Sequence, residues 1–202
     1  MATLITSLRI RMRLLAEALR SDTRGNVSIE AIILVPMLFW AYMMIYGVFD
    51  AYRKQTDGLR VSYAVADAIS REENAIDQQY LDSMITLADY MTNSPSPVTQ
   101  RVTIVCYSAE NTEYHVAWSK TSGGYVEELP PHTNATLNQS DHRLPEIVVG
   151  DQVILVETFV HYAPLLNLSI TQKMFDYWTF TRPRFTNQVK YENEDEWVCP
   201  AA

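Results

Sequence analysis

The sequence predicts an α+β fold in which a long N-terminal transmembrane helix continues outward, followed by an amphipathic helix and an antiparallel β-sheet. Three observations predict it: an uncharged apolar run over Ala31–Phe49, apolar residues at helical spacing between Asp77 and Met91, and β-branched and aromatic segments with turn signals after Val98. The chain has 202 residues, of which 48% are hydrophobic and 20% charged, so a wholly disordered chain is excluded.

The apolar run Ala31–Phe49 is long enough to cross a bilayer. A helix of this length rises roughly 28 Å, close to the ~30 Å thickness of the hydrocarbon core. The run is longer than the apolar part of a secretory signal, and no small-residue cleavage site follows it directly, so we expect it to remain as an anchor. This divides the chain into a basic leader over 1–25, a transmembrane helix over 26–50 and an outer domain over 51–202.

Charge predicts the orientation of this anchor. Residues 1–24 hold five arginines against Glu17 and Asp22, whereas the whole chain has a net charge of −8. Basic residues ahead of a span favour a cytoplasmic N-terminus, which leaves the acidic domain outside the cytoplasm. Three basic residues beyond the span weaken this asymmetry: Arg53, Lys54 and Arg60.

A small residue and an acid precede the apolar run. Gly25 ends the basic stretch, and Glu30 stands directly before Ala31. A carboxylate at this depth is costly unless it reaches the interface or meets a cation. Cleavage after Gly25 would make Asn26 the new N-terminus, and its α-ammonium would lie one helical turn from Glu30, because positions i and i+4 share a face. The two charges can pair within one chain or between neighbours.

This arrangement resembles the type IV pilin superfamily, whose signal is a glycine, then the first mature residue, and a glutamate at the fifth mature position. The stretch RGNVSIEAIILVPMLFWAYMMIYG is most similar to TadE-like minor pseudopilins of tight-adherence (Tad/Flp) pilus systems, and Gly25, Glu30 and Pro36 fit their R-G-x-x-x-x-E-x-x-x-x-x-P pattern. The run GDQVILVETFVHYAPLL resembles a late pattern of these proteins more loosely. Pro36 removes one helical hydrogen bond and predicts a kink near Ile32.

The resemblance implies a minor pseudopilin of the bacterial inner membrane that a prepilin peptidase trims after Gly25. Its implied role is to assemble or prime an adhesive pilus, either from the membrane or within the fibre. Besides the lipid bilayer, the implied partners are the prepilin peptidase, other pilins or pseudopilins packed against the apolar helix, and the inner-membrane assembly platform. The open alternative is an uncleaved, single-pass anchored binding or sensory module in which Glu30 faces lipid head groups.

The elements of the outer domain follow from periodicity. The anchor helix is expected to continue over 52–69 with Val61, Val65, Ala68 and Ile69 on an apolar face, and an amphipathic helix to begin at Asp77 and to end at Asn93-Ser94-Pro95. The polar stretch Pro130–Pro145 reads as a long surface loop, either an interaction surface or disordered. Four or five antiparallel strands are expected in the following segments: 98–107, 113–118, 147–149, 152–162 and 175–181.

Two cysteines, Cys106 and Cys199, would face an oxidising periplasm, where disulfides persist. Pairing would close a loop of nearly a hundred residues, which contributes about 4–5 kcal/mol in the chain-entropy model. The alternative is one buried and one exposed thiol.

No residue pattern indicates catalysis or a cofactor. The sequence lacks a nucleophile elbow, a phosphate-binding loop and a dinucleotide fingerprint. Four scattered histidines form no metal-binding spacing, and Asp141-His142 with His132 reads as a solvated loop. The net charge argues against nucleic acid as a partner. We therefore expect a protein that is not an enzyme and holds no metal. The four histidines are His115, His132, His142 and His161.

Overall fold

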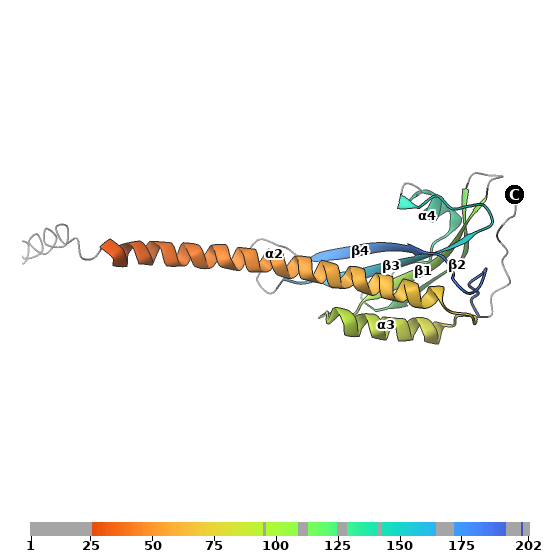
Figure 1. The fold of residues 1–202 in the computed structure, drawn as a ribbon, viewed down its shortest axis with the longest axis horizontal. Coiled ribbons are helices and arrows are strands. Elements are labelled where there is room, and N and C mark those ends of the chain that lie inside the picture. Colours follow the sequence, from red (N-terminus) through yellow and green to blue (C-terminus); the bar gives the residue numbers. More distant parts are fainter. Residues whose placement is uncertain are drawn as a thin grey trace, which may run out of the picture. The chain divides into compact units, whose positions relative to one another are not determined.

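The computed structural model describes residues 26–94, 96–108, 113–124, 129–140, 143–164, 172–192 and 199. It confirms the α+β class and divides the chain into two compact units, residues 1–46 and residues 47–202. The elements are α2 (Asn26–Ser70), α3 (Gln78–Thr92), β1 (Thr99–Ser108), β2 (Glu113–Gly123), α4 (Asn134–Asn138), β3 (Gln152–Tyr162) and β4 (Lys173–Thr181) (Figure 1).

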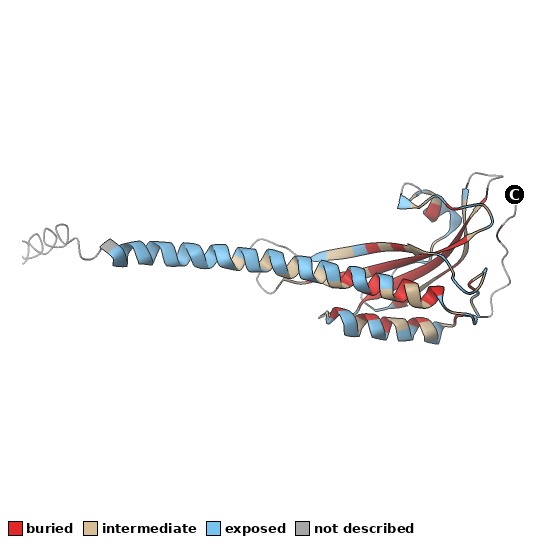
Figure 2. Ribbon diagram, viewed as in Figure 1, coloured by how far each residue is buried: buried red, intermediate tan, exposed pale blue. Residues whose placement is uncertain are grey.

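The helix α2 changes character along its length. Its N-terminal part is exposed, whereas buried residues begin at Gly58 (Figure 2). The predicted apolar face of its C-terminal part is confirmed for Val61, Val65 and Ile69, which are fully buried. Ala66 rather than Ala68 completes that face. This part of α2 is therefore a core helix of the outer domain.

The helix α3 begins and ends where its sequence predicts. The carboxylate of Asp77 accepts a hydrogen bond from the backbone N–H of Tyr80 at 2.7 Å, which caps the first turn. At the other end, Asn93 adopts a left-handed conformation with φ of 43°. The ammonium of Lys54 on α2 donates to the carbonyls of Thr92 and Asn93 at 3.1 Å, so it satisfies the end of α3.

The four strands form one antiparallel sheet in the order β2-β1-β3-β4. The helices α2 and α3 cover one face, and α4 lies on the other (Figure 1). The hydroxyls of Ser62 on α2 and Thr179 on β4 share a buried hydrogen bond of 2.7 Å. The helix-covered face includes Val102, Ile104, Trp118, Ile154, Val156, Val160 and Tyr177. The smaller cluster on the other face comprises Val105, Leu137, Ile147, Val153 and Leu155.

Two expectations for the sheet and its loops are wrong. The segment 147–149 is not a strand: Ile147 packs into the smaller cluster and the chain turns at Gly150, whose φ is 85°. The stretch Pro130–Pro145 is not simply a loop, because it contains α4, whose Thr133 forms a capping box with Thr136. Burial of Leu137 in the smaller cluster supplies the tertiary contact that so short a helix needs.

The helix α4 also protects the edge of the sheet. The side-chain oxygen of Asn138 accepts from the backbone N–H of Tyr114 at 2.9 Å, and that of Asn134 accepts from Val116 at 2.8 Å. The amide of Asn138 donates back to the carbonyl of Tyr114 at 2.9 Å. Asn134 and Asn138, one turn apart on α4, thus bond backbone groups of the edge strand β2 that a further strand would otherwise bond. Exposed edge strands are prone to pair with other chains, so these bonds protect β2.

Gly58 provides the close contact between α2 and β4. A Cβ at this position would lie 2.5 Å from Cε2 of Tyr177, whose ring is buried. We expect Gly58→Ala to lower the free energy of unfolding by about 1–3 kcal/mol through overpacking. Gly47→Ala is the matched control, since a Cβ there meets nothing within 4 Å. Urea unfolding of the full chain in detergent measures both, and an equal effect of the two substitutions would contradict this packing.

Candidate functional site

The N-terminal part of α2 exposes apolar side chains that no other described residue covers. Among the described residues, one helix is long and apolar enough to cross a membrane, Val27–Ser70, and no residue of its most apolar stretch is buried. Glu30 is the only charged residue between Val27 and Phe49. A helix that is apolar all round requires an apolar environment. Its exposed apolar side chains include Ile32, Ile33, Val35, Met37, Leu38, Phe39, Trp40, Ile45 and Phe49.

The predicted processing and assembly residues lie at the start of this helix. Gly25 is outside the described residues. Asn26 is the first residue of α2, and Glu30 follows one turn later on the same face, with its side chain exposed. Pro36 lies inside α2, which continues through it, so the kink near Ile32 stays a prediction.

The predicted disulfide between Cys106 and Cys199 is present, with 5.8 Å between the two Cα atoms. Both residues are buried. Cys106 lies in β1, where its backbone pairs with Gln152 of β3, and the sulfur of Cys199 approaches the carbonyl of Asp151. The bond therefore attaches residue 199 to the end of β1, one of the two central strands of the sheet.

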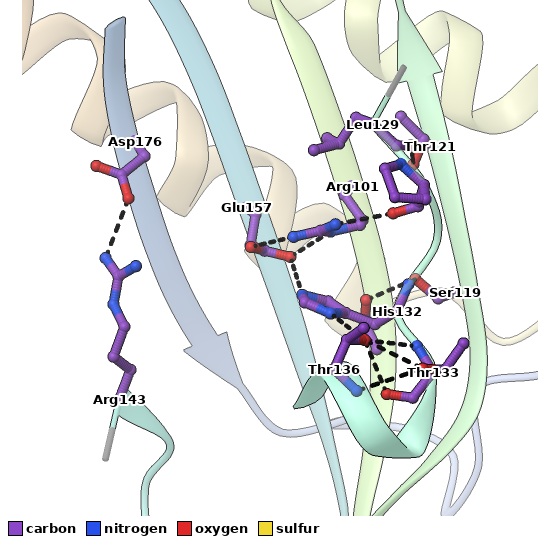
Figure 3. A network of polar contacts seen from close by, with 12 residues as sticks. Arg101, Ser119, Thr121, Leu129, His132, Thr133, Thr136, Arg143, Glu157 and Asp176 are labelled. Atoms are coloured by element: carbon purple, nitrogen blue, oxygen red, sulfur yellow. Dashed lines mark hydrogen bonds and ion pairs between the residues drawn. The ribbon is translucent and has the colours of Figure 1, made fainter. Parts of the chain in front are cut away.

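Three ionisable side chains meet on the α4 side of the sheet and form a buried ion cluster, Arg101, His132 and Glu157 (Figure 3). The guanidinium of Arg101 on β1 holds Glu157 on β3 in a bidentate contact, Nε to Oε2 at 2.6 Å and NH2 to Oε1 at 2.7 Å. Its third nitrogen donates to the carbonyl of Pro130 at 2.8 Å. Glu157 is only 1% exposed, so this pair has little access to water.

The third member, His132, joins the cluster to α4. Its Nε2 lies 2.9 Å from Oε2 of Glu157, and its Nδ1 lies 3.2 Å from the hydroxyl of Thr136. Its backbone N–H donates to the hydroxyl of Ser119 on β2 at 2.9 Å. Contacts of both ring nitrogens and of the backbone N–H therefore fix His132 in place. Together with the bond from Arg101 to Pro130, they hold the segment before α4 against β1, β2 and β3.

The charge on Glu157 is stabilised despite its burial. Burial by itself raises the pKa of a carboxyl, but the hydrogen bonds and charges of His132 and Arg101 outweigh it and lower the pKa of Glu157 below its usual value. An ionised carboxylate with all of these donors is a strong structural acceptor.

A second ion pair lies beside this cluster near the edge strand β4. The guanidinium of Arg143 contacts Asp176 at 3.1 Å (Figure 3). It also lies 4.2 Å from the ring centre of Trp178. Both partners of this pair are partly exposed. The contact covers Trp178 and holds the segment after α4 against the sheet.

The geometry of the described residues offers no metal centre. Among them, no group of three or more histidine, cysteine, aspartate or glutamate side chains is placed to hold an ion. Asp141 and His142 lie outside the described residues. Within the described part of the chain, His115 lies on β2, His132 lies just before α4 and His161 lies on β3.

Reasoning from the sequence missed the buried ion cluster. Its signal is a charged residue inside an otherwise apolar strand, which occurs at Arg101 in VTQRVTIVCY and at Glu157 in QVILVETFVHY. Charged residues are rarely buried unless they are paired, so two such strands indicate a cross-strand ion pair. The position of His132 carries no comparable signal.

No protein-family model, curated protein or solved structure matches this chain.

Proposed function

We propose that this protein is a minor pseudopilin of a tight-adherence type IV-like pilus, anchored in the bacterial inner membrane with its outer domain in the periplasm. A prepilin peptidase cleaves it after Gly25. The mature chain then takes part in assembly or priming of the pilus through lateral contacts of its apolar helix with other pilins or pseudopilins, and through the assembly platform. It is not an enzyme.

The observation that carries this proposal is the uncovered start of α2. Apolar side chains are exposed throughout its N-terminal part, and its single charge, Glu30, lies one turn after the residue that cleavage would make the N-terminus. Lipid or like helices can cover this surface. A carboxylate among packed apolar helices is costly when unpaired, so a partner ammonium would favour one register of assembly over others.

The outer domain supports a scaffolding role. Its described residues are held together by a disulfide, a core on both faces of the sheet and a buried ion cluster. Such a domain suits binding to other proteins of an assembly. The oxidised Cys106–Cys199 pair also agrees with a periplasmic location.

Glu30→Gln tests the assembly role apart from processing. The substitution keeps the size of the side chain but removes its charge, so we expect cleavage to continue while cross-linking to neighbouring pilin helices and incorporation into pili fall to background. Glu73→Gln, an exposed glutamate of the outer domain, is the matched control. Unchanged cross-linking and piliation in Glu30→Gln would contradict charge pairing as the basis of assembly.

A further inference from the structure

A hollow of about 230 Å³ opens where α2 leaves its apolar run. One wall is the helix and the other is formed by the facing ends of β3 and β4, where Tyr162 and Lys173 are paired in register. All of its lining residues belong to the compact unit 47–202. They include Val48, Ala51, Tyr52, Tyr162, Lys173 and Phe175.

The position of the hollow along α2 gives its depth in the membrane. Val48 lies inside the uncharged run, which ends at Phe49, and Tyr52 follows within the next turn of the same continuous helix. Tyrosines are enriched at this level of a bilayer, where an apolar ring and a polar hydroxyl meet both phases. If α2 spans the membrane as proposed, the hollow opens among the lipid head groups.

The chemistry of the lining suits one end of a lipid. Val48, Ala51 and Phe175 supply an apolar wall, and Lys173 supplies an exposed ammonium at its edge. The nearby carboxylate of Asp50 accepts a hydrogen bond from the hydroxyl of Tyr162 at 3.1 Å. The exposed Arg53 adds a second positive charge at the same level of α2. Among the described residues that line the hollow, Lys173 carries the one charge, and it is positive in a chain whose net charge is −8.

We propose that this hollow binds the head group of an anionic phospholipid from the membrane that α2 spans, with Lys173 contacting the phosphate and the apolar wall receiving the start of the acyl chains. The inference rests on the proposed anchoring of α2 and adds a lipid site to it. Such a site would set how closely the outer domain lies to the membrane, and it would make that placement depend on anionic lipid.

Native mass spectrometry of the full chain tests this site. The protein is released from nanodiscs that contain equal amounts of phosphatidylglycerol and phosphatidylcholine with identical acyl chains. We expect the wild type to retain phosphatidylglycerol in preference. Lys173→Gln should reduce that preference roughly fivefold, the effect of one lysine near an anionic surface. Lys173→Arg keeps the positive charge and should retain the preference. Lys190→Gln is the matched control, because Lys190 is also exposed but lies in the segment bonded to Ile76, outside the lining of the hollow.

Each outcome of this experiment has one meaning. Equal retention of the two lipids, or the same preference in wild type and Lys173→Gln, would overturn the lipid site. Displacement of the lipid by millimolar inorganic phosphate would show that the site takes free phosphate and would overturn the lipid as its occupant. A chain that does not enter the nanodiscs at all would instead overturn the anchoring on which the proposed function depends.

Discussion

Replacing Glu157 with glutamine is expected to lower the free energy of unfolding by about 3–5 kcal/mol, because it leaves the buried charge of Arg101 uncompensated. Glu157 is 1% exposed, and its carboxylate accepts two hydrogen bonds from Arg101. His132 contacts Oε2, the oxygen that also accepts from Nε of Arg101. Glutamine has a single acceptor oxygen and no charge. Urea unfolding of the full chain in detergent, followed by tryptophan fluorescence, measures the loss.

The paired substitution separates the charge from the packing. Arg101→Met with Glu157→Leu removes both charges and keeps apolar bulk, so we expect the double variant to be more stable than Glu157→Gln. A double variant as unstable as Glu157→Gln would mean that shape and not unpaired charge determines the loss. A Glu157→Gln loss below about 1 kcal/mol would contradict the cluster itself.

The same substitution should make stability less dependent on pH. The pKa of Glu157 is lowered in the folded protein, so its contribution is complete above the ordinary glutamate pKa and disappears as pH falls through the lowered value. The difference in unfolding free energy between wild type and Glu157→Gln should therefore shrink in acid. A difference that stays constant from neutral to strongly acidic pH would contradict a depressed pKa.

Loss of the disulfide should have a comparable effect. Cys106 and Cys199 are separated by 93 residues, so in the chain-entropy model Cys199→Ala lowers the free energy of unfolding by about 4–5 kcal/mol. Cys106→Ala with Cys199→Ala should behave like the single variant, since either change removes the same bond. Treatment of the wild type with a reductant during unfolding gives a third measure of the same quantity.

These variants also show whether the purified protein carries the bond. A reductant should have no effect on Cys199→Ala, which has already lost the bond. Wild type that is equally stable with and without reductant would contradict a disulfide between Cys106 and Cys199.

The sequence was most informative where a local pattern determines the structure. The carboxylate of Asp77 and the left-handed Asn93 mark the limits of α3 because capping depends on residues within one turn. The apolar face of α2 at Val61, Val65 and Ile69 follows from helical period alone. The disulfide could be proposed because the chain has two cysteines to pair.

Prediction was wrong or silent where tertiary contacts decide. The helix α4 is too short for periodicity to reveal, and it depends on the burial of Leu137 and on Asn138 bonding to β2. The pairing of Arg101 with Glu157 depends on the register of β1 against β3, which no local pattern fixes. Likewise, the segment 147–149 is β-branched like a strand, but it forms no strand. Its Ile147 packs into the smaller cluster just before the turn at Gly150.

Cleavage after Gly25 is the most direct test of the pseudopilin proposal. Intact mass and N-terminal sequencing of the protein from membranes of its own host, for the wild type and for Gly25→Ala, give the answer. We expect a wild-type chain that begins at Asn26 and a Gly25→Ala chain that keeps the leader. A full-length wild-type chain in those membranes would contradict the proposal and would leave an uncleaved, membrane-anchored binding module as the better description of this protein.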